Sequence, residues 1–181
     1  MKKQFLLLCA LFLMNVLSHA QEREYIVTKS KDTIYGSVTR GTKIFNPAEV
    51  KLKFKDEAGN ESVIDPAEVK TIRSLNGVDG DSFISTIHDQ WFVKRIVDGR
   101  IKIYKFMDVA LLFISKDDSE ITSAEFGGFS PRSKGHAQIK ELIKDNPEIS
   151  MEFDTMKGSE KNILYIINKY NEVEKILPPV N

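Results

Sequence analysis

Cysteine is almost absent from this chain of 181 residues, which holds only Cys9. A single cysteine excludes an intrachain disulfide framework and any zinc or iron–sulfur site built from several cysteines. An excess of charge of one sign is also lacking, since 26 Lys and Arg residues balance 26 Asp and Glu residues. Domains that bind nucleic acid are usually strongly basic, so this balance argues against a nucleic-acid partner.

Long apolar runs are missing too, apart from one near the N-terminus. Two lysines are followed there by the apolar residues 5–17 and then by Ser18-His19-Ala20. A positive start, a short apolar segment and small residues before a cleavage site are typical of a secretory signal peptide. We therefore predict that residues 1–20 are a signal peptide, that cleavage falls between Ala20 and Gln21, and that the chain is exported.

Two other fates of this segment stay open. It would remain as an anchor if Ala20 were not cleaved, although its apolar stretch is shorter than the about 20 residues of a standard transmembrane helix. It would carry a lipid if Cys9 were acylated, but Leu8 stands where a small residue is expected. No later segment reaches spanning length. We therefore expect the cleaved chain to be soluble, periplasmic or secreted, and stabilised by its core alone.

Residues 21–126 are predicted to form an antiparallel β domain, because short β-rich segments alternate there with turn residues. The stretch 109–114 is apolar throughout, which predicts a central strand that is buried on both faces. The expected strands are 25–28, 33–39, 50–55, 62–64, 83–87, 92–97, 100–104 and 109–114, with a last short strand near Ile121.

One of these strands shows the expected pattern most clearly. Val50, Leu52 and Phe54 alternate with lysines, as in a strand with one buried and one solvated face. The motif Asn46-Pro47-Ala48-Glu49-Val50 that leads into it recurs as Asp65-Pro66-Ala67-Glu68-Val69. Proline keeps the residue before it out of the helical region. Each copy therefore predicts a turn that leads into a strand.

The strongest hairpin signal is Asp98-Gly99, which lies between two β-rich segments. Asp-Gly favours a two-residue type I′ turn, in which both residues adopt positive φ. With this turn Ile96 would pair with Ile101, and Arg95 would pair with Lys102.

The apolar spacing changes to that of helices in residues 127–181. We expect one helix over 136–145, a second that begins at Pro147 with Asn146 as its cap, and a third capped by Ser159. The third helix should dock on the sheet through Ile163, Ile166, Ile167 and Tyr170. The fold class is therefore α+β: an antiparallel β-sheet, or a roll or barrel-like domain, followed by two to three C-terminal helices that pack on it.

Several of these segments resemble a group of exported proteins from Bacteroidota-type bacteria. An aromatic-Ile-Val segment before Asp-Thr-Ile-x-Gly opens that group, and a β domain and C-terminal helices follow. The matching segments here are Tyr25-Ile26-Val27, Asp32 to Gly36, Asp65 to Val69, Val97 to Tyr104, Asp145 to Glu148 and Tyr170-Asn171. Lys31 departs from the glycine usual before the Asp-Thr pair. The resemblance implies export and this fold, and it implies no activity.

His88 and Asp89, with Trp91 nearby, form the most tempting cluster for chemistry. A histidine beside a carboxylate suits a general base or one edge of a metal site. Adjacent residues on a strand point to opposite faces, however, so we favour a polar turn that is anchored by Trp91. Trp91 alone would also suit stacking on a sugar ring, but a single tryptophan usually belongs to the core.

Five cations give the hairpin over residues 93–105 a basic character. Such a surface would attract anionic glycans or lipid headgroups. Lysines on strands also block edge-to-edge aggregation, which is the simpler explanation. The cations are Lys94, Arg95, Arg100, Lys102 and Lys105.

Three further features suggest ligands but lack the pattern that each site needs. Asn76 to Asp81 lacks the EF-hand spacing for calcium, so a flexible turn is expected. Residues 127–135 lack the Walker and Rossmann orders, although Arg132 and free backbone N–H groups would suit an anion at this helix start. His136 shows no second metal ligand and is expected on the solvated surface.

The sequence thus indicates no catalytic residue, no metal ligand and no cofactor. We expect an exported, non-enzymatic cell-envelope or secreted protein, a binding or interaction module for an unknown protein or envelope ligand. One alternative is a small periplasmic hydrolase-like enzyme that uses carboxylates and His88. Another is a module that binds anionic glycan or lipid through the hairpin 93–105. The candidate ligand-binding residues are His88, Trp91, Lys94, Arg95, Arg100 and Lys102.

Overall fold

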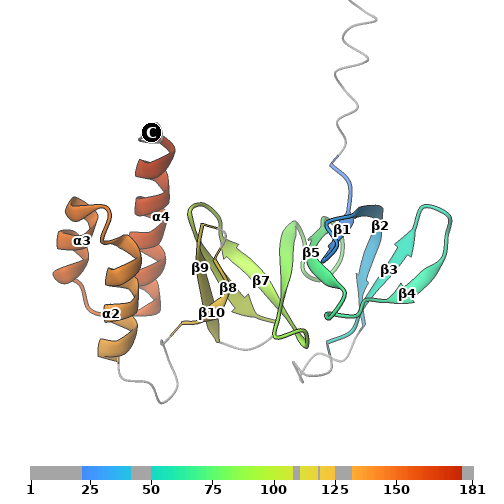
Figure 1. The fold of residues 1–181 in the computed structure, drawn as a ribbon, viewed down its shortest axis with the longest axis horizontal. Coiled ribbons are helices and arrows are strands. Elements are labelled where there is room, and N and C mark those ends of the chain that lie inside the picture. Colours follow the sequence, from blue (N-terminus) through green and yellow to red (C-terminus); the bar gives the residue numbers. More distant parts are fainter. Residues whose placement is uncertain (1–21, 42–49, 108–110, 118, 125–131, 177–181) are drawn as a thin grey trace, which may run out of the picture.

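The computed structural model describes residues 22–41, 50–107, 111–117, 119–124 and 132–176 (Figure 1). They form a ten-stranded antiparallel sheet followed by three helices, so the predicted α+β class is confirmed. The strands are β1 (Tyr25–Thr28), β2 (Thr33–Arg40), β3 (Leu52–Asp56), β4 (Glu61–Val63), β5 (Val69–Ser74), β6 (Ser82–Ile87), β7 (Trp91–Val97), β8 (Ile101–Phe106), β9 (Leu112–Lys116) and β10 (Thr122–Ser123). The helices are α2 (Arg132–Ile143), α3 (Pro147–Asp154) and α4 (Glu160–Ile176).

The sheet follows the chain from strand to neighbouring strand except at β1. The order is β10-β9-β8-β7-β6-β5-β1-β2-β3-β4. Tyr25 of β1 lies opposite Tyr35 of β2 on one side and opposite Arg73 of β5 on the other. β1 therefore joins the part β2–β4 to the part β5–β10.

The first core lies inside the curl of strands β1–β7. Leu52 and Phe54 of β3 belong to the same buried cluster as Ile72 of β5 and Ile84 of β6. The predicted alternation is confirmed, because Leu52 and Phe54 are buried whereas Lys53 and Lys55 are exposed. Most of the cover for this half of the sheet thus comes from the sheet itself.

The buried carboxylate of Glu24 connects three segments of the strands around the first core. Glu24 is 7% exposed and accepts hydrogen bonds from the backbone N–H groups of Val38 (2.9 Å), Leu75 (2.7 Å) and Asn76 (2.8 Å). Burial by itself raises the pKa of Glu24, but these backbone donors and Ser74 outweigh it, and the pKa is lowered overall. One side chain therefore ties the chain before β1 to β2 and to the end of β5.

The predicted turn at Asp65 is also present. The backbone N–H of Ala67 donates to Asp65 Oδ1 at 2.8 Å, and that of Glu68 donates to the Asp65 carbonyl at 3.1 Å. This turn leads directly into β5, as the sequence predicts. The first copy of the motif, at 46–50, lies outside the described residues except for Val50.

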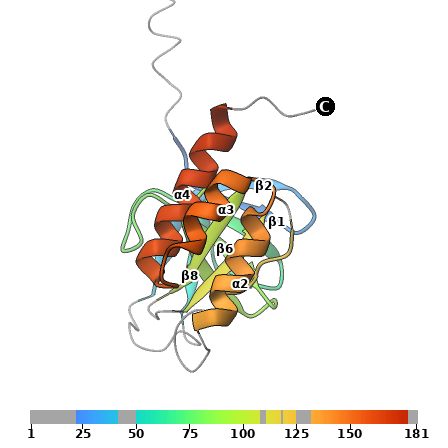
Figure 2. The same cartoon turned by 90° about the vertical axis from the view of Figure 1, so that its left-hand side faces the viewer.

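The second core lies between the three helices and the sheet (Figure 2). Val97, Ile101 and Ile103 of β7 and β8 and Leu112 and Ile114 of β9 supply the sheet side. The predicted docking face is confirmed, since each member is at most 1% exposed: Ile163, Ile166, Ile167 and Tyr170.

Judged by length and hydropathy, the helices in the described residues do not qualify as membrane-spanning.

Both predicted helix caps are confirmed. Asn146 Oδ1 accepts from the backbone N–H of Ile149 at 3.2 Å, and Pro147 is the first residue of α3. Ser159 Oγ accepts from the backbone N–H of Asn162 at 3.3 Å at the start of α4. Caps depend on residues a few positions apart, which is why the sequence reveals them. The first helix begins at Arg132 rather than at 136.

The predicted register of the β7–β8 hairpin is wrong. Arg95 lies opposite Tyr104 and Val97 opposite Ile103, with a register shift between Arg95 and Val97. The side chain of Asn171 on α4 explains the longer connection, because it binds the backbone of both hairpin arms. Its Oδ1 accepts from the Ile101 N–H (2.9 Å), and its Nδ2 donates to the carbonyls of Ile101 (2.8 Å) and Asp98 (3.2 Å).

The shift has a consequence for the core. It places Val97 on the same face as Ile101 and Ile103, under the helices, and leaves Ile96 39% exposed. Bulges re-aim side chains in this way. The Asp-Gly pair therefore marks the place of the connection, but the predicted type I′ turn is wrong, because Gly99 has a positive φ of 148° whereas Asp98 does not have a positive φ.

The apolar segment near residue 112 is buried on both faces, but it is not central. β9 pairs with β8 and with the two-residue β10, so it is next to the edge of the sheet. Leu112 and Ile114 face the helices, while Phe113 packs with Phe106 in a third cluster on the opposite face. The prediction of a central strand is wrong because cover by helices makes a strand as apolar as a central position does. Residues 109 and 110 lie outside the described part.

Candidate functional site

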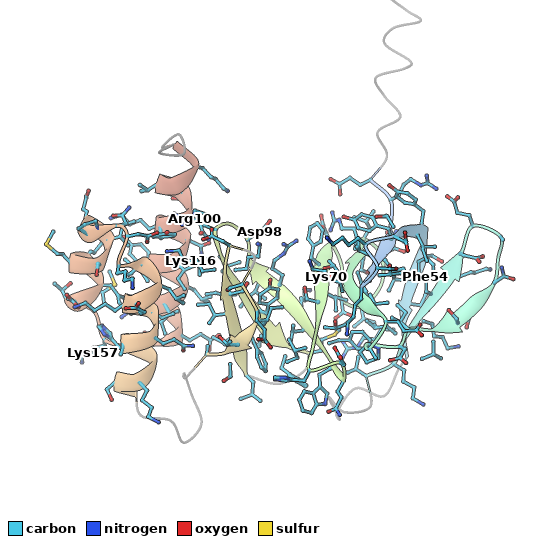
Figure 3. All side chains as sticks on the ribbon, viewed as in Figure 1. Phe54, Lys70, Asp98, Arg100, Lys116 and Lys157 are labelled. Carbon is cyan, nitrogen blue, oxygen red and sulfur yellow. The ribbon has the colours of Figure 1, made fainter. Side chains whose placement is uncertain are left out.

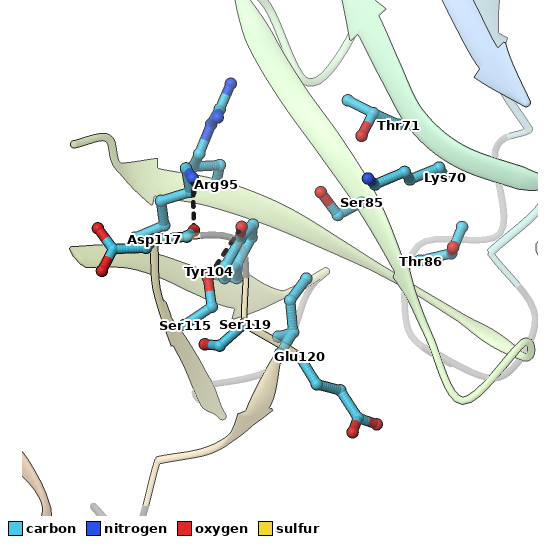
Figure 4. Close-up of a pocket in the computed structure, with 12 residues that line it drawn as sticks. Lys70, Thr71, Ser85, Thr86, Arg95, Tyr104, Ser115, Asp117, Ser119 and Glu120 are labelled. Atoms are coloured by element: carbon cyan, nitrogen blue, oxygen red, sulfur yellow. Dashed lines mark hydrogen bonds between the residues drawn. The ribbon is translucent and has the colours of Figure 1, made fainter. Parts of the chain in front are cut away.

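A groove of about 390 Å³ lies on the face of the sheet that is turned away from the helices (Figure 4). One wall consists of Lys70 and Thr71 of β5 and of Ser85 and Thr86 of β6. The opposite wall consists of Lys102 and Tyr104 of β8, Ser115 of β9 and the β9–β10 connection with Asp117, Ser119, Glu120 and Ile121. Arg95 of β7 lies between the two walls.

Strand pairing brings these residues together. Thr71 lies opposite Ser85, and Lys102 lies opposite Ser115. Arg95 lies opposite Tyr104. Residues two apart on a strand share a face, so each strand from β5 to β9 contributes a polar side chain to this face.

Hydroxyl groups dominate the interior of the groove. Ser85, Tyr104 and Ser115 are 9%, 5% and 4% exposed. Tyr104 Oη and Ser115 Oγ lie 3.4 Å apart, and Thr86 Oγ1 donates to the Val69 carbonyl at 2.6 Å. The hydroxyls of Ser85 and Thr71 have no hydrogen-bond partner in the part of the chain that the structure describes. Two hydroxyls thus remain available to a ligand.

Three cations lie around these hydroxyls. The Lys102 ammonium donates to the Asp117 carbonyl at 2.9 Å, and the Lys70 ammonium makes no ion pair within the described residues. Arg95 ends over the ring of Phe83, with its guanidinium carbon 4.0 Å from the ring centre, and pairs with the exposed Asp98 at 3.0 Å. Lys70 and Lys102 therefore line the groove without a carboxylate partner among the described residues.

The carboxylates of the groove do not cancel this charge. The Arg100 guanidinium donates to both oxygens of Asp117 at 3.0 and 3.3 Å and lowers the pKa of Asp117. The carboxylate of Glu120 points away from Tyr104 (Figure 4). The interior of the groove is therefore rich in hydroxyls and biased toward positive charge.

The predicted pair His88 and Asp89 lies outside this groove. Both residues have positive φ, 49° and 56°, and form the turn between β6 and β7, closed by a hydrogen bond from the Gln90 N–H to the Ile87 carbonyl at 3.2 Å. Asp89 pairs with Lys29. His88 is exposed and makes no hydrogen bond to a carboxylate within the described residues. The interpretation as a polar turn is confirmed.

Trp91 anchors that turn, as expected. Its ring lies edge-on to the His88 ring, with centroids 5.9 Å apart, and 6.1 Å from the ring of Phe106. It packs against the third cluster, which contains Phe106 and Phe113. Trp91 is half-buried and does not line the groove.

The predicted basic face of the hairpin is wrong. Lys94 and Lys105 lie opposite each other on one face of the sheet, whereas Arg95 and Lys102 lie on the other face. Arg100 lies in the connection and binds Asp117 and Asp145 where the helices meet the sheet (Figure 3). The shifted register and the alternation of strand residues separate these charges. Of the six candidate residues, the structure brings only Arg95 and Lys102 into the groove.

The remaining candidates have structural surroundings. His136 is half-buried, stacks on Phe153 at 4.2 Å and forms a hydrogen bond between its Nε2 and the Phe153 carbonyl at 3.2 Å, so the predicted solvated position is wrong. Asp79 and Asp81 of the loop 76–81 pair with Arg40 and Arg73. Residues 127–131 and the side chain of Arg132 lie outside the described part. No cluster of possible metal ligands occurs among the described residues.

Sequence reasoning missed the groove residues Lys70, Thr71, Ser85, Tyr104 and Ser115. The available signal was a hydroxyl at an outward position in several successive strands. That signal acquires meaning only when the order and register of the strands are known. Comparisons with protein-family models, with curated proteins and with solved structures give no match.

Proposed function

We propose that the chain is an exported, non-enzymatic protein of the cell envelope or of the secreted fraction, and that it acts by binding a ligand in the groove between β5–β6 and β8–β10. Export rests on the signal-peptide pattern of residues 1–20. Binding rests on a concave site with convergent polar groups, which is the usual form of a ligand site. The observation that carries the proposal is the Ser85 hydroxyl, which faces the groove, is reached by solvent there and has no hydrogen-bond partner among the described residues.

The hydrolase alternative has little support from the geometry. It requires His88 beside an acid from another strand, inside a concave site. His88 instead lies in an exposed turn outside the groove. We therefore do not propose an activity for this cluster.

Export is tested by expressing the full sequence in a Gram-negative host and measuring the mass of the protein in the periplasm and medium. We expect a chain that begins at Gln21. An Ala20→Lys variant should accumulate with its N-terminal segment attached, because the peptidase accepts small residues at this position. A wild-type chain that keeps residues 1–20 in the cytoplasm would contradict the export proposal.

Binding is tested by a thermal-shift screen of the purified protein against glycans, peptidoglycan fragments, lipids and nucleotides. A ligand at about 100 times its Kd stabilises a protein by about 2.7 kcal/mol, which raises the melting temperature by roughly 5–10 °C at this size. Thr71→Trp should fill the groove and abolish the shift. Thr33→Trp is the matched control, because Thr33 and Thr71 both lie opposite Val27 and share its face of the sheet.

The screen has a clear negative outcome. A sharp cooperative melt that no ligand class shifts would overturn the groove as a small-ligand site. A shift that Thr71→Trp and Thr33→Trp retain equally would place binding elsewhere on the molecule, which also contradicts the proposal.

A further inference from the structure

We infer that the ligand of the groove is an acidic saccharide, a short sugar chain that carries carboxylates. This inference rests on the proposed function, because it names the ligand class of the same site. One alternative from the sequence is an anionic glycan bound by the whole hairpin 93–105. We now propose that such a glycan binds only in the groove, which Arg95 and Lys102 of that hairpin line.

The lining of the groove favours a hydrophilic ligand. Sites for small molecules are usually lined mainly by apolar and aromatic side chains. Among the described residues of the lining, Ile121 is the single aliphatic one and Tyr104 the single aromatic one. The aliphatic parts of polar side chains supply much of the remaining apolar surface, so the groove offers polar groups beside almost every apolar one. A sugar, which presents hydroxyls in most directions, suits this lining.

The hydroxyls of the groove match those of a sugar. Each serine, threonine or tyrosine hydroxyl donates one hydrogen bond and accepts others, as sugar hydroxyls do. Ser85 is 9% exposed, and its hydroxyl is directed into the groove without a partner among the described residues (Figure 4). Every enclosed side-chain polar atom among the described residues has a partner, so the unpartnered Ser85 oxygen is one that solvent reaches from the groove. A ligand hydroxyl can therefore take the place of water at Ser85.

The charges of the groove require an anionic group on that sugar. Lys70 directs its amine into the groove from one wall (Figure 4), and Lys102 reaches it from the other. The Lys102 ammonium is held by a neutral carbonyl, because the carboxylate of Asp117 is bound by Arg100. Two ammonium groups without a carboxylate partner in the groove attract a carboxylate of the ligand.

The size of the groove limits the length of the sugar. Small-molecule sites occupy about 300–1,000 Å³, and the groove, at about 390 Å³, lies near the lower end of that range. It is also partly open to solvent. A short segment of an acidic chain fits such a site, and the rest of a longer chain would extend into solvent.

Isothermal titration calorimetry with trigalacturonate and its methyl ester tests the inference. The two probes carry the same hydroxyls, and the ester lacks the charges. We expect the acid to bind at least about tenfold more tightly than the ester, and binding of the acid to weaken as salt is added. Acetate, which has the charge without the hydroxyls, should not compete at the same concentration.

Three variants connect the binding to particular residues. Lys70→Gln should weaken binding of the acid by about five- to tenfold and leave binding of the ester unchanged. Lys51→Gln, at an exposed lysine just before β3, is the matched control and should bind as the wild type does. Ser85→Ala should weaken both probes by about threefold or more while the melting temperature stays equal or rises, because the lost hydroxyl has no partner in the described residues.

Each result is decisive for one level of the proposal. Equal affinity for acid and ester, or no effect of Lys70→Gln, would overturn the acidic ligand. If trigalacturonate does not bind while another class shifts the melting temperature in a manner that depends on Thr71, the saccharide is overturned and the groove stands. If no class shifts it, both proposals fail together. A fall in melting temperature for Ser85→Ala would show a structural role for that hydroxyl and would contradict its role in binding.

Discussion

The two halves of the sheet bury their core face in different ways. In β1–β6 this face is covered by other strands of the same sheet, whereas in β7–β9 it is covered by the three helices. The first half closes through its own curl, with Leu52 and Phe54 of β3 and Ile72 of β5 in one buried cluster. The second half depends on α2–α4, which follow the sheet in the chain. The opposite face stays open at the strands where these two modes of cover meet, and the groove lies there. The difference teaches that one sheet can supply two cores on one face and an open groove on the other.

A polar seam separates the two cores along β7. Phe92 belongs to the first core and Val97 to the second. Lys94 lies between them and donates to the backbone carbonyl of Asp79. Asp79 in turn pairs with Arg40 at 3.0 Å, and both of their side chains are at most 12% exposed. The two halves therefore share strands but not a continuous apolar core, and their stabilities can be tested separately.

The largest expected effect is on the helical half. Phe153→Ala should lower the free energy of unfolding by about 3–5 kcal/mol, because Phe153 is fully buried and also stacks on His136. Denaturant unfolding measures this loss, and hydrogen exchange shows where it falls. Protection should decrease first in α2–α4 and β7–β9. An equal decrease in β1–β3 would show that the halves unfold as one unit and would remove the distinction.

The counterpart in the strand-covered half is Gly36. A Cβ at this position would lie 2.3 Å from the Lys55 carbonyl oxygen and 2.6 Å from Phe54 Cζ, so β2 and β3 would have to separate. Gly36→Ala should cost about 1–3 kcal/mol, with exchange increased in β1–β4. Gly59→Ala is a useful comparison, because nothing lies near that position and only its positive φ opposes the change. An unchanged unfolding midpoint for Gly36→Ala would disprove the close approach of the strands.

A smaller effect is expected at Asn171, which joins α4 to the β7–β8 connection within the helix-covered half. Asn171→Ala removes the acceptor of the Ile101 N–H and should cost about 1–2 kcal/mol. The effect should be greatest in the β7–β8 connection, which amide chemical shifts report residue by residue. Asn168→Ala, at an exposed position of the same helix, is the control. Unchanged shifts at Asp98–Ile101 would contradict the role of the amide.

The smallest expected effect is acid sensitivity, which both halves share. Burial raises the pKa of Glu24, yet its backbone donors lower it overall; burial likewise raises the pKa of Asp145, yet Lys116 and Tyr170 lower it overall. A carboxyl group whose pKa is lower in the folded state stabilises the fold above its unfolded pKa and loses this contribution as the pH falls. The unfolding free energy should therefore decrease below about pH 5.

Two variants divide this acid effect between the halves. Glu24→Gln and Asp145→Asn should each give a shallower dependence of the unfolding midpoint on pH between about pH 3 and 6. When the pH is lowered, hydrogen exchange should show a loss of protection in β1–β2 of the wild type. The loss between neutral and low pH should be smaller in Glu24→Gln. A slope as steep in both variants as in the wild type would show that other carboxyl groups govern acid unfolding.

The sequence predicts those elements whose determinants are local. Asn146 and Ser159 cap their helices within three residues, and Leu52 and Phe54 define their strand by simple alternation. The register of the β7–β8 hairpin is not local, because the amide that sets it belongs to Asn171, on the last helix. A turn motif alone therefore predicts the place of the hairpin but not its pairing.

The candidate site was less predictable than the fold. Arg95 and Lys102 attract notice as charges in a hairpin, but Ser85 and Tyr104 look ordinary in their strands. They meet because β6, β7 and β8 are neighbours in this register. His88 attracts notice for its chemistry, yet its positive φ places it in a turn. Chemical reactivity read from a sequence selects single residues, whereas a binding groove arises from the arrangement of several ordinary ones.

The position of β1 has a consequence for the order in which the protein assembles. In a chain that emerges from its N-terminus, β1 and β2 are available to each other early and form a local hairpin. The other edge of β1 has to wait for β5, which appears only after β3 and β4. During that interval β1 offers an open edge of four residues to any other chain nearby. The pairing of β5 is therefore the step that covers this edge of β1, after which β4 and β10 are the edge strands of the sheet.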